Sequence, residues 1–289
     1  MKRFLFFGTL TATLLALFLL LRPAVSAIGS PAVPDTVGRA KELLPEERAG
    51  GAAATATTTV AGPKPVAGPP MEVIEQQVLA LTNEARRTAG LPPVALDESL
   101  RRAARSHARD MIDRGFTDSI NPDGLTAEDR VSRENRRAVA LVGETLGAGS
   151  VKDAELARHL VADWAGNPTE REKVLRPDFT QIGVGVVPSG DEVRAVQLFG
   201  RTVALTDTPI PEKVAAGSTV RVVLAAGDPS LQCSTLDVFA PDTGLAAVGP
   251  LPFGDVAMNV APGVYRLRIQ CAGNGSTRIY SGPRIEVTR

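Results

Sequence analysis

Three segments of the chain carry apolar residues at the three- and four-residue spacing of a helix that is buried on one face. Asp97 precedes the second segment as a capping residue, and Gly90 and Gly166 end the first and third. Trp164 lies on the apolar face of the third. We therefore predict helices over residues 71–90, 97–115 and 156–166.

Other segments have the pattern of strands. The sequence I-G-V-G-V-V at 182–187 predicts a buried strand, and its glycines, Gly183 and Gly185, predict that another backbone or side chain approaches closely. We predict a turn between Gly166 and this strand, and this turn carries Glu170.

The last part of the chain lacks helical periodicity. The segments 220–224 and 265–271 alternate apolar and polar residues, and Pro-, Asp- and Gly-containing turn signals separate them. Residues 206–211 have the composition of a short hinge. We therefore predict that residues 208–289 form a small β-sandwich of immunoglobulin-like type.

The chain begins with the pattern of an export signal. Lys2 and Arg3 precede an uncharged apolar run, and small residues lead up to Ala27. We interpret residues 1–27 as a cleaved signal peptide, with an uncleaved membrane anchor as the alternative because the run is barely long enough to span a bilayer. The protein is thus predicted to be secreted or held in the cell envelope, and only an uncleaved segment would contact a membrane.

Residues 28–70 differ from the rest of the chain in composition. They are rich in Ala, Pro, Gly and Thr and poor in large apolar residues. Such a segment buries too little surface to offset the entropy of ordering, so we predict a disordered linker.

Charge excludes one class of partner. The chain has 32 basic and 32 acidic residues, and removal of residues 1–27 takes away three basic residues and no acid. A nucleic-acid-binding protein needs a basic surface, so we expect no nucleic acid partner.

Cys233 and Cys271 are the two cysteines of the chain, and both fall in the predicted β-sandwich. In an exported protein we expect them to form a disulfide, which would stabilise the fold by roughly 4 kcal/mol in the chain-entropy model. Their spacing is not the C-x-x-C of metal or redox sites.

Two blocks of the sequence resemble a known family. The first reads L-T-N-E-A-R-R-T-A-G-L-P-P-V followed by L-D-E-S-L-R-R-A-A-R-S-H-A-R-D-M, and the second reads W-A-G-N-P-T-E-R-E-K-V-L followed by F-T-Q-I-G-V-G. Both resemble the bacterial branch of the CAP superfamily (cysteine-rich secretory proteins, antigen 5 and pathogenesis-related proteins). This resemblance implies an α-β-α sandwich over residues 71–204 and an α+β chain as a whole.

The family carries two histidines in its cleft, and this chain is similar there but has carboxylates instead. Asp118 stands where the first histidine would be, and Glu170 stands in the place of the second. The acid of the family motif G-E-N-I-A-x-G is retained as Glu144. The resemblance therefore implies a ligand-binding cleft with Asp118, Glu144, Asn167 and Glu170.

The chain's two histidines have other interpretations. His107 lies among alanines on the apolar face of the second predicted helix, so we interpret it as structural. His159 lies off the apolar face of the third helix, and we expect it to face solvent. Zinc prefers nitrogen and sulfur ligands, so we do not expect the family's zinc here.

Three carboxylates in one cleft leave three interpretations open. Asp118, Glu144 and Glu170 could bind a hard cation such as calcium. Glu144 and one of the others could share a proton as the acid and base of a hydrolase. The carboxylates could also be solvated or paired with Arg130 or Arg171. Nucleophilic catalysis is disfavoured, because the chain lacks a G-x-S-x-G motif.

The function that we predict is a non-catalytic binding module of the envelope or extracellular space, with a lipid, cell-wall or protein ligand. One alternative is a carboxylate-based or calcium-dependent hydrolase. Another is a structural or adhesion protein whose cleft is a relic. The choice stays open because a fold does not carry an activity with it.

Overall fold

The computed structural model describes residues 70–273 and 275–289. The predicted signal segment and all but the last residue of the predicted linker lie outside this range. Within it, no helix is both long and apolar enough to cross a membrane. The described residues belong to one compact unit.

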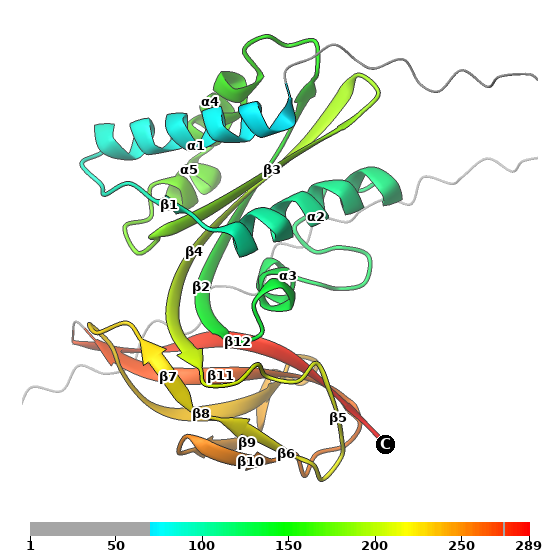
Figure 1. The fold of residues 1–289 in the computed structure, drawn as a ribbon, viewed down its shortest axis with the longest axis vertical. Helices are drawn as coiled ribbons and strands as arrows, with labels where there is room; N and C mark the ends of the chain where they lie inside the picture. The colour runs from blue at the N-terminus through cyan, green and yellow to red at the C-terminus, as the bar shows by residue number, and fades with distance from the viewer. Residues whose placement is uncertain (1–69, 274) are drawn as a thin grey trace, which may run out of the picture. The chain divides into compact units, whose positions relative to one another are not determined.

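The part of the chain up to Thr206 has three layers (Figure 1). Its central strands are, in spatial order, β1 (Ala95–Leu96), β3 (Gln181–Ser189), β4 (Glu192–Thr206) and β2 (Ala138–Ser150). One face packs against α1 (Met71–Thr88), α4 (Leu156–Gly166) and α5 (Pro168–Val174), and the other against α2 (Glu98–Arg114) and α3 (Ala127–Glu134). The predicted α-β-α sandwich and the α+β class are confirmed.

Strand β3 shows how the two faces are filled. Its residues Ile182, Val184 and Val186 pack against the apolar faces of α1 and α4. Gly183 and Gly185 alternate with them and face α2, where a methyl group at Gly183 would lie 2.1 Å from backbone atoms of that helix. The close approach predicted from these glycines is confirmed.

The three predicted helices form as α1, α2 and α4. Asp97 caps α2, because its Oδ1 accepts hydrogen bonds from the N–H groups of Ser99 and Leu100. Trp164 is buried, and its Nε1 donates to the carbonyl oxygen of Leu146 at 2.8 Å. Periodicity and capping thus place these helices correctly.

The prediction of a turn after Gly166 is wrong. Residues Pro168–Val174 form the short helix α5, and Glu170 lies in its first turn. Asn167 starts this helix by accepting hydrogen bonds from two of its first backbone N–H groups, and a proline in the first turn suits a helix start.

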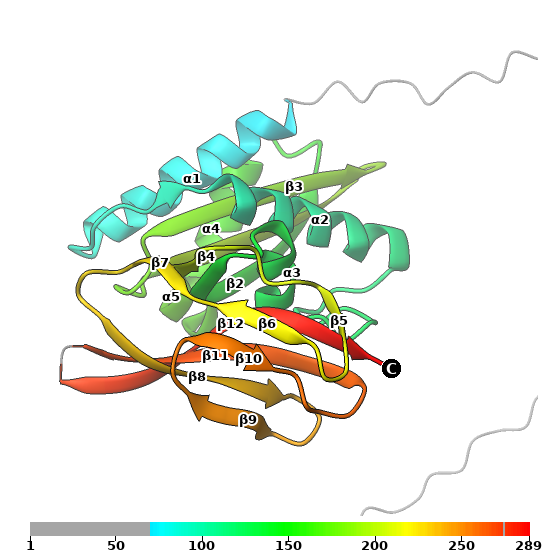
Figure 2. The same ribbon diagram turned by 60° about the horizontal axis from the view of Figure 1, so that its bottom comes forward.

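The C-terminal part is built from strands in two sheets (Figures 1 and 2). The strands are β5 (Lys213–Ala215), β6 (Thr219–Val222), β7 (Leu224–Gly227), β8 (Gln232–Ala240), β9 (Leu245–Leu251), β10 (Gly254–Ala257), β11 (Gly263–Gly273) and β12 (Ser276–Thr288). One sheet has the order β12-β11-β8-β9, and β6 pairs with β10 in the other. Val222 and Val256 of the second sheet share an apolar cluster with Leu236, Leu267 and Ile285 of the first. The β-rich C-terminal part is confirmed, and its immunoglobulin-like type stays a prediction.

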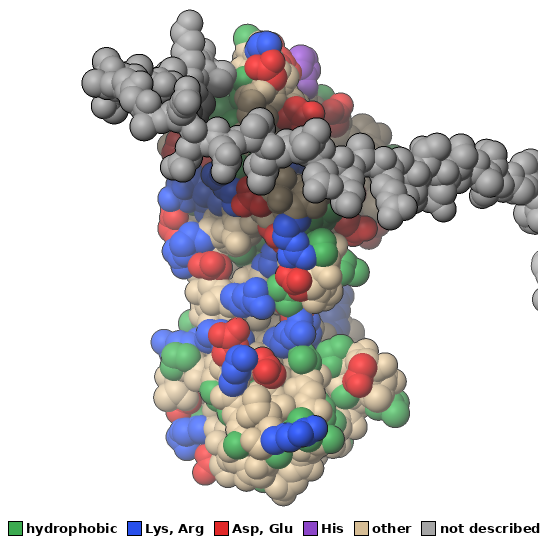
Figure 3. Space-filling view, turned by 90° about the vertical axis from the view of Figure 1, so that its right-hand side faces the viewer, with side chains coloured by type: hydrophobic (Ala, Val, Ile, Leu, Met, Phe, Trp, Pro, Cys, Tyr) green, Lys and Arg blue, Asp and Glu red, His purple; other side chains and the backbone are tan. Residues whose placement is uncertain are grey.

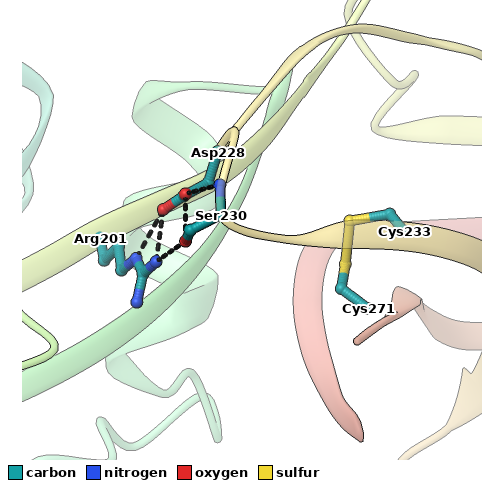
Figure 4. Close-up of a disulfide and its surroundings, with 5 residues drawn as sticks. All are labelled: Arg201, Asp228, Ser230, Cys233 and Cys271. Atoms are coloured by element: carbon teal, nitrogen blue, oxygen red, sulfur yellow. Dashed lines mark hydrogen bonds and ion pairs between the residues drawn. A yellow bond between two sulfur atoms is a disulfide. The ribbon is translucent and has the colours of Figure 1, made fainter. Parts of the chain in front are cut away.

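The predicted disulfide is present (Figure 4). Cys233 on β8 and Cys271 on β11 are direct cross-strand partners. The bond therefore joins two neighbouring strands, with Cys271 inside the C-terminal core and Cys233 packed against it.

The two parts are joined by strand pairing and ion pairs. Strand β12 pairs with β2 at Ala140, and β7 pairs with the end of β4. Arg201 of β4 donates to Asp228 beyond β7, as Figure 4 shows. Ile210 of the predicted hinge is buried in the C-terminal core, so this segment is packed between the parts. On the face drawn in Figure 3, basic and acidic side chains lie interspersed.

Candidate functional site

A pocket of about 410 Å³ lies beside β2, between the start of α3 and α5. The residues that line it are Ser119, Ile120, Thr126, Ala127, Glu128, Val142, Gly143, Glu144, Thr169, Glu172, Lys173, Arg176 and Phe179. Of the four predicted cleft residues, only Glu144 is among them. The volume is within the range of small-ligand sites.

Glu144 is held in a buried ion pair. Its side chain is 4% exposed, and its Oε1 accepts a hydrogen bond from Arg130 Nη2 at 2.6 Å. Its Oε2 has no hydrogen-bond partner and lies 3.9 Å from Nε2 of His107. Burial raises the pKa of Glu144, and the charge of Arg130 opposes this change.

His107 lies behind this carboxylate. The ring is fully buried on α2, with Nε2 3.0 Å from the carbonyl oxygen of Asp118 and with Nδ1 unpartnered. Burial, and then the charge of Arg130, lower the pKa of His107 to about 4. The ring is therefore neutral at neutral pH, and it packs behind Glu144 without lining the pocket.

His159 differs from His107 in its exposure to solvent and in the direction in which its pKa is shifted. Its side chain is 61% exposed, which confirms that it faces solvent. Its Nδ1 lies 2.6 Å from Asp153, and this hydrogen bond raises the pKa of His159.

The other predicted cleft residues have partners close to them in sequence. The carboxylate of Asp118 accepts a hydrogen bond from the backbone N–H of Ile120 at 3.0 Å. Asn167 uses its side-chain oxygen to cap α5. Glu170 accepts hydrogen bonds from Lys173 Nζ at 3.0 and 3.1 Å.

The three carboxylates do not meet as a group. Among the residues that the structure describes, no three His, Cys, Asp or Glu side chains are placed so that they could hold a metal ion. The set Asp118, Glu144 and Glu170 therefore does not fit the calcium interpretation. The pairing of Glu144 with Arg130, one of the interpretations left open by the sequence, is the arrangement observed. Arg171 instead donates to a backbone carbonyl at the end of α4.

Arg86 supports the pocket wall without lining it, and the sequence interpretation missed this residue. It is fully buried on α1 and donates hydrogen bonds to the carbonyl oxygens of Pro92, Val174, Arg176 and Phe179. It thereby fixes the turn between α5 and β3, which supplies two residues of the pocket wall. The signal was present in the sequence, because this arginine follows Val78 and Thr82 at four-residue spacing on the face that α1 buries.

Comparisons with known proteins agree with this architecture. Residues 79–199 match the family model described as CAP, the cysteine-rich secretory protein family. The Bacillus subtilis protein YkwD is 29% identical over 160 residues, which are 55% of this chain and 58% of that protein. The chain thus spans a little over half of the length of this relative.

Solved structures of surface and extracellular proteins are also similar. An outer surface protein from Borrelia burgdorferi is 19% identical, with a TM-score of 0.42, over 46% of this chain and 96% of that chain. An extracellular Bacillus anthracis protein containing an SCP domain is 27% identical, with a TM-score of 0.39, over 45% of this chain and 41% of that chain. Residues 79–199 of this chain are therefore similar to the CAP family, as the matching family model and the resemblance to YkwD indicate.

Proposed function

We propose that this protein acts outside the cytoplasm as a non-catalytic binding module, with the pocket beside Glu144 as its ligand site. The observation that carries the proposal is the state of Glu144. It is the one predicted cleft carboxylate in the pocket wall, and it is buried and paired with Arg130. A carboxylate held in this way shapes and polarises a pocket floor, whereas a general acid or base must reach the proton that it transfers.

The surroundings of Glu144 support the same conclusion. Neither Asp118 nor Glu170 is linked to it by a hydrogen bond within the described residues, and each is engaged elsewhere. A carboxylate pair that shares a proton requires direct contact between the two groups. The disulfide and the extracellular type of the relatives support a location outside the cytoplasm.

The test is ligand binding to the full chain and to a variant with a blocked pocket. Thr169 is exposed and lines the pocket, so Thr169→Trp should fill its mouth without disturbing the core. Thr243→Trp, in the exposed turn after β8, is the matched control. The probes are phospholipid vesicles, soluble fragments of bacterial cell wall and capped peptides, measured by calorimetry. Binding of one class that is lost only in Thr169→Trp supports the proposal, and no binding of any class contradicts it.

A hydrolase is the second candidate, because the raised pKa of Glu144 and its unpartnered oxygen are features of a general acid. It predicts turnover of a cell-wall or peptide substrate that Glu144→Gln abolishes at a temperature at which circular dichroism shows that the variant is folded. If the wild-type protein binds a ligand but shows no turnover, the binding module is supported and the hydrolase is excluded.

A further inference from the structure

One edge of β2 is open beside the pocket. On one side β2 pairs with β4 along its length, whereas on the other side, within the described residues, it pairs with β12 at Ala140 alone. Further along this edge, Trp164 of α4 covers the carbonyl oxygen of Leu146. Between these points lie Val142 to Glu144, and they line the pocket.

The register of the sheet shows which backbone groups point to this edge. The Gly200 carbonyl accepts a hydrogen bond from the chain just before β3, so Gly200 directs its backbone groups toward β3. Phe199 next to it directs its groups toward β2, where it is paired with Gly143. Alternate residues of a strand direct their backbone groups to opposite edges. Val142 and Glu144 therefore direct their N–H and C=O groups away from β4 and toward the pocket.

A row of unpaired backbone donors and acceptors recognises one kind of partner best. An extended peptide presents the matching row, and pairing with it adds a strand to the sheet. Residues of α3 and of α5 line the pocket, and these two helices lie on opposite faces of the sheet beside β2 (Figure 1). Successive side chains of an added strand would therefore enter the two halves of the pocket in turn.

The charges in the pocket favour a cationic side chain. Glu128 of α3 and Glu172 of α5 line it, and neither forms an ion pair within the described residues. The two cations in the lining, Lys173 and Arg176, are each paired with a carboxylate that is not part of the lining. The charge left to attract a ligand is therefore the negative charge of Glu128 and Glu172, since Glu144 is paired with Arg130.

We propose that the open edge of β2 at Val142–Glu144 binds an extended peptide segment of another protein as an added strand, with a lysine or arginine side chain of that segment beside Glu128 or Glu172. The proposal rests on the proposed function and assigns a ligand class to the same pocket.

The first test varies the peptide and keeps the full chain unchanged. The probe is a fluorescent, capped peptide of alternating Thr and Val with a central Lys, measured by anisotropy. We expect binding that weakens with added salt, because ion pairs are screened, and that weakens about tenfold or more when the central Lys is replaced by Glu. N-methylation of two alternate amides that face β2 should weaken binding about tenfold or more, because it removes hydrogen-bond donors. N-methylation of two amides that face away should leave affinity within about twofold.

The second test varies the edge of the protein. Val142→Pro removes an N–H that takes no part in the β2–β4 ladder and places a ring carbon at the open edge. It should weaken binding about tenfold, whereas Val142→Thr, which keeps the N–H, should lose much less affinity. Glu128→Gln combined with Glu172→Gln should weaken binding of the lysine peptide about fivefold, with the exposed Glu192→Gln as control.

The outcomes separate this proposal from the proposed function. Equal affinity for the two N-methylated peptides, or unchanged binding to a Val142→Pro protein with a native melting temperature, overturns the added strand. If vesicles or cell-wall fragments bind in a manner that Thr169→Trp blocks and the peptides do not bind, the peptide proposal fails and the binding module stands. If none of the probes binds, both fail.

Discussion

The two parts of the molecule bury different kinds of residue. Within the described residues, every buried polar or charged side chain lies at or before Thr206, and among them are Arg86, His107 and Glu144. The part from Lys213 onward buries apolar side chains around strands that are joined by a disulfide. The N-terminal part thus uses buried hydrogen-bonding groups to fix its turns and its pocket, whereas the C-terminal part gains stability from apolar packing and a covalent bond.

The largest effect is expected from Arg86, whose removal would test whether one buried cation organises the N-terminal part. We expect Arg86→Leu to lower the free energy of unfolding by about 3–5 kcal/mol, because the carbonyl groups of Val174 and Phe179 lose a donor in buried hydrogen bonds and two part-buried carbonyl groups lose it as well. The measurement is urea unfolding. The neighbouring Arg87 has a side chain that is 75% exposed, so Arg87→Leu should cost less than about 1 kcal/mol. Similar losses in the two variants would contradict the organising role of Arg86.

Removal of the disulfide tests the C-terminal part. The double variant Cys233→Ala, Cys271→Ala should lose about 2–4 kcal/mol of stability, and a reducing agent should have the same effect on the wild type. Ligand binding at the pocket should persist under native conditions, since Cys233 and Cys271 are not among the residues that line it. A variant that is as stable as the wild type would show that apolar packing alone supports this part.

A smaller effect is expected where α2 and β3 touch. In Gly185→Ala the new methyl group would lie 2.2 Å from the backbone nitrogen of Arg105, so the helix must move. We expect a loss of about 1–3 kcal/mol in thermal unfolding. Gly166→Ala at the end of α4, where an added methyl group meets open space, should change stability by less than about 1 kcal/mol. If Gly185→Ala had the stability of the wild type, α2 and β3 would be less closely packed than in the structure.

The smallest expected effect concerns the two histidines, one buried and one exposed, whose pKa values should be shifted in opposite directions. NMR titration of the two imidazole rings should give a pKa near 4 for His107 and a pKa above the ordinary value of 6.5 for His159. Because the pKa of His107 is lowered in the folded state, the unfolded state binds a proton first as the pH falls below about 6.5. The contribution of His107 should therefore reduce stability by about 1–2 kcal/mol between pH 7 and pH 5, and His107→Gln should remove this part of the pH dependence. A His107 pKa near 6.5 would show that the ring is open to water.

Sequence periodicity predicted the elements whose packing is local. Helices α1, α2 and α4 repeat their apolar positions over several turns, and Asp97 marks the start of α2. The glycines of β3 predicted the contact with α2, because only a missing side chain permits so short a distance. Helix α5 escaped prediction because its seven residues are too few for a periodic pattern.

Features that depend on distant partners were not predictable in this way. The pairing of Ala140 with Ser281 joins segments far apart in sequence and leaves no local signal in either. The resemblance placed Glu144 in a cleft, and in the structure Glu144 lines a pocket. It did not indicate that Asp118 and Glu170 would accept hydrogen bonds from residues close to them in sequence, because a side chain's orientation depends on the donors that lie near it.

The join between the parts decides where this protein can be divided. Val139, near the start of β2, and Ala204, near the end of β4, belong to the apolar cluster of the C-terminal part. Asp129 on α3 is buried and pairs with Arg266 of β11 at 2.6 Å, and the next residue on the helix, Arg130, holds Glu144. A cloning boundary at residue 204 would cut through one hydrophobic core and leave a buried carboxylate without its cation. Gene fusion or recombination must therefore transfer both parts together for the pocket to keep its floor.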